Sequence, residues 1–261
     1  MAKYAIGVSY DGAAFHGWQR QVELSTVQGV LEDAASRIAD HPVQLHVAGR
    51  TDAGVHASGQ VAAFSSAASR ELFDWQRGLN GLTPAAVRIN WIKPVDDTFH
   101  PRYSAVARRY VYLFHDIGFE DPLVTGRAWQ CPTLDVDAMH RSAQLLVGEH
   151  DFSSFRGAGC QSLTPMRRLN HCIVRRHGHW VSMDIQANAF VLHMVRNIAA
   201  ALYGVGTASA EMSLEALLAA RDRTLLGPTA PPQGLYLTDV SYPQFNLPDP
   251  APLAWLADRP A

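Results

Sequence analysis

The order in which strand-like and helix-like patterns follow one another most limits the folds open to this chain of 261 residues. Alternation of apolar and polar residues is typical of half-buried strands, and apolar residues three or four apart are typical of helices. The first hundred residues give the order strand, helix, two strands, helix, strand, at 3–10, 25–39, 43–47, 59–64, 71–79 and 87–92. This order predicts an α+β half built on an antiparallel sheet.

The second part of the chain repeats this order without a convincing repeat of the sequence. After a crossing at 99–104 we expect strand 108–114, helix 135–146, paired strands 172–176 and 180–185, a long helix 187–204, a short helix 214–221 and a closing strand near 235–237. We therefore expect two similar ferredoxin-like halves, joined into one largely antiparallel sheet with helices on one face and an active-site cleft between the halves. The expected divisions are 1–102, 103–243 and a Pro-rich tail, 244–261.

Composition and cysteine usage are those of a globular protein in a reducing compartment. The chain is 48% hydrophobic and 18% charged, which predicts a soluble protein with a sizeable core. No apolar run reaches the ~18 residues of a membrane span, and the strand-like pattern that begins at Met1 leaves no room for a signal peptide. Three cysteines without C-x-x-C spacing favour reduced thiols and a cytoplasmic location.

The positive charge is clustered, although the whole chain has a net charge of −2. From Phe152 to Ala200 there are six arginines and one acid, Asp184, which gives a local charge of +5. Such a cluster can bind phosphates in a chain that is otherwise near neutral. A general use of arginine in place of lysine is the alternative, and it explains the residue type but not the clustering.

One short loop is built to present a carboxylate. Residues 48–57 lie between the strand-like runs 43–47 and 59–64 and contain Gly49, Arg50, Asp52 and Gly54. Glycines allow backbone angles or close approaches that a Cβ would block. A guanidinium two residues away keeps Asp52 ionised, so that it could act as a nucleophile or a base. The alternative is that Asp52 only caps a turn, because Asp beside Gly is ordinary turn chemistry.

Two further features leave functional alternatives open. Phe15 and Trp18 lie in a loop without clean periodicity, where they could stack on bases or simply pack against the core. His177 and His179, with His171, could suggest a metal hydrolase. Against this, no H-E-x-x-H or Cys/His zinc spacing occurs, and the pair is predicted to occupy an exposed hairpin turn. A non-catalytic RNA-binding protein is the other alternative.

The run Gly49-Arg50-Thr51-Asp52-Ala53-Gly54-Val55-His56-Ala57 resembles the signature of the tRNA pseudouridine synthase A family, in which the Asp is the catalytic nucleophile. Similar stretches follow in the expected order over residues 4–242, among them Tyr10-Asp11-Gly12, Gly17-Trp18-Gln19, Gly59-Gln60-Val61, Arg109-Tyr110-Val111-Tyr112, Phe152-Ser153-Ser154-Phe155-Arg156 and His193-Met194-Val195-Arg196-Asn197. Pro101 stands where the family usually has Ala, and Leu82-Thr83-Pro84 carries one extra residue. The tail after Pro243 matches nothing in the family.

The resemblance implies isomerisation of uridine to pseudouridine at positions 38, 39 and 40 of the tRNA anticodon stem-loop, without a metal or other cofactor. It implies that Asp52 attacks a flipped-out nucleotide and that Arg196 is the partner of this carboxylate. Tyr110 would stack on the uracil, and Arg50 would contact the RNA and hold the nucleotide open. By themselves, Tyr110 would be interpreted as a core tyrosine and Arg196 as part of a structural salt bridge.

The same resemblance implies two stretches that touch tRNA, Phe99-His100-Pro101-Arg102-Tyr103 and Cys160-Gln161-Ser162-Leu163-Thr164. Five arginines lie in or near them, and we expect them to contact phosphates: Arg102, Arg108, Arg156, Arg167 and Arg168. The resemblance also implies a homodimer in which each tRNA contacts both subunits. No membrane partner is expected.

Overall fold

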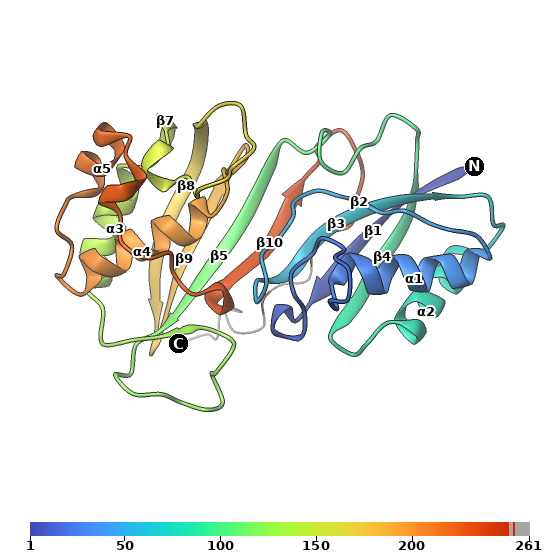
Figure 1. Ribbon diagram of the computed structural model, residues 1–261, viewed down its shortest axis with the longest axis horizontal. Helices are drawn as coiled ribbons and strands as arrows, with labels where there is room; N and C mark the ends of the chain where they lie inside the picture. The colour runs from blue at the N-terminus through green and yellow to red at the C-terminus, as the bar shows by residue number, and fades with distance from the viewer. Residues whose placement is uncertain (251–252, 254–261) are drawn as a thin grey trace. The chain divides into compact units, whose positions relative to one another are not determined.

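The computed structural model describes residues 1–250 and 253, and the chain divides into two compact units (Figure 1). Unit 1 is Met1–Val106 together with the segment that begins at Tyr236, and unit 2 is Ala107–Leu235. Strands pair mainly antiparallel in both units and helices pack on the strands. The α+β class predicted from the sequence is therefore confirmed.

In unit 1 the strand order is β4, β1, β3, β10, and short β2 also pairs with β3. All these pairs are antiparallel except β10 with β3, where Tyr236 lies opposite His56. The Trp75 ring contacts the rings of Tyr4 and Phe64, which places α2 over β1 and β3. The bounds are β1 Ala2–Tyr10, α1 Val27–Ala39, β2 His46–Val47, β3 His56–Ser66, α2 Leu72–Leu82, β4 Val87–Val95 and β10 Leu235–Ser241.

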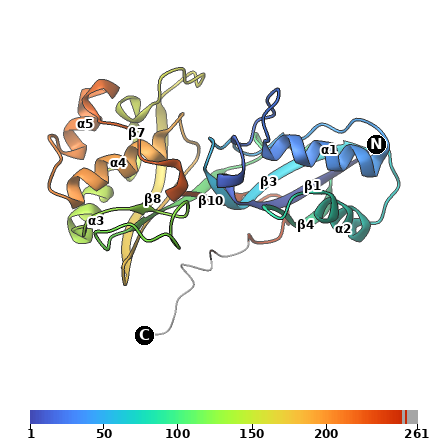
Figure 2. The same ribbon diagram turned by 60° about the horizontal axis from the view of Figure 1, so that its bottom comes forward.

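In unit 2 the strand order is β5, β9, β8, β7, all antiparallel (Figure 1), and β6 lies parallel to the end of β5. Helix α3 lies beside β8 (Figure 2). Gln144 at the end of α3 donates a 2.7 Å hydrogen bond to the Cys172 carbonyl of β8. The bounds are β5 Ala107–His115, β6 Trp129–Gln130, α3 Val136–Gln144, β7 Gly148–Asp151, β8 Met166–His177, β9 Trp180–Ala187, α4 Met194–Gly206 and α5 Leu214–Ala220. Short 3₁₀ turns are η1 Gly12–Ala14, η2 Ser153–Phe155, η3 Arg223–Leu225 and η4 Pro232–Gly234.

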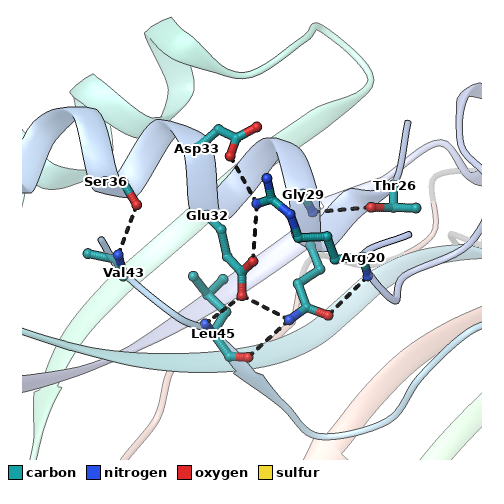
Figure 3. A network of polar contacts seen from close by, with 9 residues as sticks. Arg20, Thr26, Gly29, Glu32, Asp33, Ser36, Val43 and Leu45 are labelled. Carbon is teal, nitrogen blue, oxygen red and sulfur yellow. Dashed lines mark hydrogen bonds and ion pairs between the residues drawn. The ribbon is translucent and has the colours of Figure 1, made fainter. Parts of the chain in front are cut away.

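Side chains of α1 bond to the backbone of a segment that we predicted to be a strand. Thr26 caps the helix, since its side chain accepts a hydrogen bond from the Gly29 amide. Of the predicted strand 43–47, only residues 46–47 pair with β3. The amide of Val43 donates instead to Ser36 Oγ, and that of Leu45 donates to the buried Glu32 carboxylate (Figure 3). Helix side chains therefore satisfy backbone groups that we expected in a strand ladder.

The start of the long helix in unit 2 was predicted seven residues too early. Strand β9 continues to Ala187, and the Asn188 side chain then accepts hydrogen bonds from the amides of Arg168 and Ala189. His193 has a φ of +60°, a left-handed conformation that a continuous helix cannot contain. Helix α4 therefore begins at Met194. Strand β8 begins six residues before its predicted start, so Arg167 and Arg168 lie in a strand and not in a loop.

The described part of the Pro-rich tail packs on unit 1. The Phe245 ring lies edge-on to Phe99 with centroids 4.9 Å apart, and Lys93 donates a 2.7 Å hydrogen bond to the Asn246 carbonyl. The remainder of the predicted tail, 251–252 and 254–261, lies outside the described residues.

Among the described residues, no helix combines the length and the apolar character that crossing a membrane requires. Cys131, Cys160 and Cys172 all have free thiols, and the first and last of these are buried.

Candidate active site

Asp52 lies in a tight turn between β2 and β3. The Val55 amide donates to the main-chain carbonyl of Asp52 at 3.2 Å, and Gly54 has a φ of +80°, where a Cβ would be strained. The Asp52 side chain is half-buried, and Arg50 is exposed. The turn that carries Asp52 is therefore closed by backbone groups.

A buried amide and a phenol fix the two residues that flank Arg50. Gln60 is fully buried on β3 and donates a 2.7 Å hydrogen bond to the carbonyl of Gly49. The hydroxyl of Tyr10 bonds Thr51 Oγ1 at 2.8 Å, and Gln60 also donates to this phenol oxygen at 3.3 Å. The chain leading to Asp52 is thus connected by hydrogen bonds to both β1 and β3.

The loop after β1 supports the other side of the turn. The Trp18 amide donates to the carbonyl of Thr51 at 3.0 Å, and a Cβ on Gly12 would lie 2.0 Å from the carbonyl oxygen of Val55. Phe15 and Trp18 are both buried, and the Trp18 ring contacts Tyr10. Of the two alternatives for these aromatics, packing against the core is the one that the structure supports.

A polar network fastens the same loop to α1 (Figure 3). The Arg20 guanidinium donates to Asp33 at 2.9 Å and to Glu32 at 3.3 Å, and its amide donates to the Gln28 side chain. Gln28 in turn donates to Glu32 at 2.8 Å. Hydrogen bonding to Asp33 and the charges of Asp33 and Glu32 raise the pKa of Arg20. Arg20 therefore has a structural partner on α1.

Residues 99–103, the first stretch expected to contact RNA, are held by aromatic packing and by hydrogen bonds. Phe99 is fully buried against Tyr242, and the Pro101 carbonyl accepts from the Tyr242 hydroxyl. His100 Nδ1 accepts from the amides of Arg102 and Tyr103, and burial, followed by the nearby positive charge, lowers the pKa of His100. Arg102 and Tyr103 remain exposed, with the guanidinium 5.8 Å from the ring centroid. This stretch presents a cation and an aromatic ring side by side.

Tyr110 lies on β5 and is 9% exposed. Its ring makes a T-shaped contact with Phe190, with centroids 5.2 Å apart. Tyr112, two residues along the same strand, donates a 2.8 Å hydrogen bond to the Pro231 carbonyl, and burial raises the pKa of this phenol. The two tyrosines share a face of the strand.

Arg196 lies in the first turn of α4 and is half-buried. Its Nε donates a 2.8 Å hydrogen bond to the Ala230 carbonyl. The neighbouring Asn197 donates to the Phe155 carbonyl and accepts from Thr229, so the start of α4 and the chain before η4 are held together. The guanidinium of Arg196 is thereby oriented inside unit 2.

The second expected RNA stretch, residues 160–164, belongs to a loop that runs from Gly157 to Pro165. Gln161, Leu163 and Thr164 are exposed, and Leu163 has 103% of its reference surface accessible. Arg156 and Arg167, which we expected to contact phosphate, donate to groups of this loop, whereas Arg168 is exposed. Arg108 donates to the Asn188 carbonyl. No sequence pattern indicated that Arg156 and Arg167 would face inward.

The three histidines that suggested a metal hydrolase do not form a group of metal ligands. His177 and His179 are exposed at the hairpin between β8 and β9, as predicted, with Gly178 at a φ of +61°. His171 lies 3.0 Å from Asp184. Within the described residues, no three His, Cys, Asp or Glu side chains are grouped as metal ligands.

The expected site residues fall into both units. Asp52, Arg50 and the stretch 99–103 belong to unit 1, and Tyr110, Arg196 and the stretch 160–164 belong to unit 2. The supporting role of Gln60 was missed, although Gly59-Gln60-Val61 is part of the family resemblance. Only the fold shows that its amide reaches Gly49, eleven residues earlier.

Comparison with known proteins identifies the family. A family model described as tRNA pseudouridine synthase matches residues 6–104 and 142–243. Curated proteins named tRNA pseudouridine synthase A are similar over nearly the whole chain: that of Aeromonas hydrophila is 48% identical, covering 98% of this chain and 97% of its own. Those of Pectobacterium atrosepticum and Salmonella arizonae are 47% and 48% identical, each covering 95% of this chain and respectively 89% and 93% of their own. The chain therefore belongs to the tRNA pseudouridine synthase family of isomerases.

Proposed function

We propose that this protein converts uridine to pseudouridine at positions 38, 39 and 40 of the tRNA anticodon stem-loop. The names of its relatives support tRNA as the substrate. The observation that carries the proposal is the fixed main chain of the Asp52 turn, held through Gly49 on one side and through the Thr51 carbonyl and Gly12 on the other. A carboxylate on a fixed main chain suits a nucleophile that must meet one atom of a bound nucleotide.

In the proposed reaction Asp52 adds to C1′ of the sugar or to the base, or takes a proton from the sugar. The N1–C1′ bond breaks, the uracil turns, and a C5–C1′ bond forms. The hydrogen on C5 leaves as a proton and N1 ends with a hydrogen, so the product is an isomer of the substrate. Because the target base lies in a stem, it must first leave the stack, which costs a few kcal/mol.

Tyr110 and the two arginines are proposed to act on the same nucleotide. The Tyr110 ring stacks on the uracil, and its hydroxyl transfers a proton when the new bond closes. Arg196, held in place through Ala230, is the ionic partner of the carboxylate. Arg50, exposed beside Asp52, contacts the RNA and holds the flipped nucleotide open.

The stretches 99–103 and 160–164, with Arg108, Arg156, Arg167 and Arg168, are proposed to serve tRNA binding. Exposed Arg102 and Tyr103 supply a phosphate contact and a ring surface, and exposed Arg168 supplies a second phosphate contact. We also propose that the protein is a cytoplasmic homodimer in which each tRNA contacts both subunits. Sedimentation of the protein with and without tRNA tests the dimer, and a monomeric complex would contradict it.

Release of tritium from C5 of uridine-labelled tRNA tests the reaction. The wild type is expected to release label, and Asp52→Asn is expected to bind tRNA normally while losing at least about 1,000-fold in rate, as loss of a nucleophile typically causes. Asp40→Asn, an exposed carboxylate at the end of α1, is the matched control and should be fully active. Full activity of Asp52→Asn would favour the non-catalytic RNA-binding alternative.

A further inference from the structure

We propose that Arg156 and Arg167 position the loop 157–165 for tRNA from the inside, and that neither contacts phosphate. The inference depends on the proposed function for the identity of the ligand. It concerns how the RNA-contacting surface of unit 2 is held in shape, and it assigns these two arginines a role different from that of exposed Arg168.

The Arg167 guanidinium is enclosed by the loop that precedes it. Its side chain is 8% exposed, and burial lowers its pKa. Nη1 donates to the carbonyls of Thr164 and Met166, and Nη2 donates to Ser162 Oγ. Both terminal nitrogens are thus engaged with neutral groups of the chain. A phosphate would have to displace these partners to reach them.

Arg156 approaches the same loop from its other end. One of its nitrogens, Nη2, donates to the carbonyls of Cys160 and Ser162, at 2.7 Å each. Together the two arginines bind the carbonyls of residues 160, 162, 164 and 166, which is every second residue. The arginines therefore bind this segment at every second carbonyl, and exposed Gln161 and Leu163 lie between the bound residues.

The loop is also attached to the turn that leads into α4. The Gly157 amide donates to the Leu192 carbonyl at 2.7 Å, and the Leu192 amide donates to Cys160 Sγ at 3.4 Å. A Cβ on Gly157 would lie 2.9 Å from the His193 ring, so the contact requires glycine. Residue 193 immediately precedes the helix that carries Arg196. The loop and the start of α4 therefore form one connected piece within unit 2.

These contacts distinguish arginines that hold the loop in shape from an arginine that supplies charge to a phosphate. In the part of the chain that the structure describes, neither Arg156 nor Arg167 pairs with a carboxylate; they donate to carbonyls and a hydroxyl, and the Arg156 guanidinium also lies near the Cys160 thiol. A planar guanidinium can reach several such acceptors at fixed angles, and a lysine ammonium cannot. An exposed phosphate contact such as Arg168 needs mainly the charge. Lysine should therefore replace Arg168 and fail to replace Arg167.

The test compares Lys and Ala at both positions in tRNA binding at several salt concentrations and in tritium release. Arg167→Lys and Arg167→Ala are both expected to raise KM about tenfold, since ordering even one loop residue on binding costs about that factor. Single-turnover rates should stay within about twofold, because the bound complex is the same. Arg168→Ala should lower the salt slope by nearly one, whereas Arg168→Lys should match the wild type.

Wild-type affinity in Arg167→Lys would overturn the inference, and so would a salt slope in Arg167→Ala reduced as much as in Arg168→Ala. Arg141→Lys and Arg141→Ala, at an exposed arginine of α3, are the controls for substituting arginine as such. Thermal melting checks folding. If Arg167→Lys does not fold, Ser162→Ala removes one acceptor and should raise KM in the same direction by a smaller factor.

Hydrogen exchange separates this inference from the proposed function. In Arg167→Lys the amides of Gly157 and Leu192 should exchange faster than in the wild type without any tRNA present, because their loop is less ordered. A wild type that neither binds tRNA nor releases label would refute the proposed function alone. A wild type that does both, with unchanged exchange and KM in Arg167→Lys, would refute only the inference.

Discussion

The turn that carries Asp52 and the loop 157–165 both present residues proposed to meet tRNA, but they are held in different ways. The Asp52 turn is fixed by backbone contacts and small residues, with Gly12 against the carbonyl of Val55 and Gln60 on the carbonyl of Gly49. The loop 157–165 is held mainly by two guanidiniums that donate to its carbonyls and to Ser162. The first is held by close main-chain packing and by side chains of the adjacent strands, and the second depends on two long guanidinium side chains.

The difference determines what each region tolerates. Close main-chain packing around Gly12 leaves no space for an added atom and fixes the backbone that carries Asp52, as a nucleophile requires. A loop held in shape by side chains loses order when one of them is removed, and binding must then restore that order. This is consistent with a reacting group in the first region and with binding surface in the second.

The largest effect is expected at Gly12, which packs against the main chain of the Asp52 turn. Gly12→Ala would bring a Cβ to 2.0 Å from the Val55 carbonyl oxygen, so the main chain beside Asp52 must move. A displacement of about 1 Å at a catalytic group costs about 100-fold in rate, and we expect that loss in tritium release. Gly159→Ala is the counterpart in the other region, with no atom within 4 Å of its Cβ and a φ of +76°. Its strain is about 1 kcal/mol, and a comparable loss of turnover there would break the comparison.

A smaller effect is expected at Gln60, whose side chain supports the Asp52 turn. Gln60→Leu removes the donor to the Gly49 carbonyl and should destabilise the protein by about 1–3 kcal/mol, the usual cost of a buried group that loses its partner. Gln76→Leu is a matched control, because Gln76 also donates to two main-chain carbonyls of unit 1, those of Ile89 and Asn90. Urea unfolding should show a loss of stability in both variants. Only Gln60→Leu should also lower kcat, and equal kcat values would mean that Gln60 has no bearing on Asp52.

The smallest effect concerns the thiol of Cys160 in the loop 157–165. Burial alone would raise the pKa of Cys160, but hydrogen bonds from the amides of Leu192 and Ser162 and the Arg156 guanidinium outweigh it and lower the pKa. Burial raises the pKa of Cys131 to about 12 and raises that of buried Cys172 as well. Because the thiolate is the reactive form, iodoacetamide should modify Cys160 first, and the rate should rise with pH from below the range of an ordinary thiol.

Mass spectrometry of the alkylated protein at pH 6 to 9 checks the order of modification, and bound tRNA should slow the reaction at Cys160. Modification of Cys131 or Cys172 before Cys160 would contradict it. Arg156→Lys should move the reaction at Cys160 toward that of an ordinary thiol, which links the thiol to the arginines that hold its loop.

Where the partners of a residue are close in sequence, the sequence predicted the structure well. Helix α1, the hairpin at Gly178 and the order of elements were expected, apart from the short strands β6 and β7, because the interactions that set them lie within a few residues. The contiguous motif around Asp52 likewise indicates the family from the sequence alone.

Other features depend on partners that are distant in sequence. The amides of Val43 and Leu45 bond to α1 instead of a neighbouring strand, and the Asn188 side chain bonds to Arg168 of β8, in a segment that we expected to be helical. Arg167 and Arg168 look alike in the sequence, yet neighbouring residues of a strand point to opposite faces. The fold puts one guanidinium inside the loop and the other in solvent, and a sequence of residue types carries no record of which side is covered.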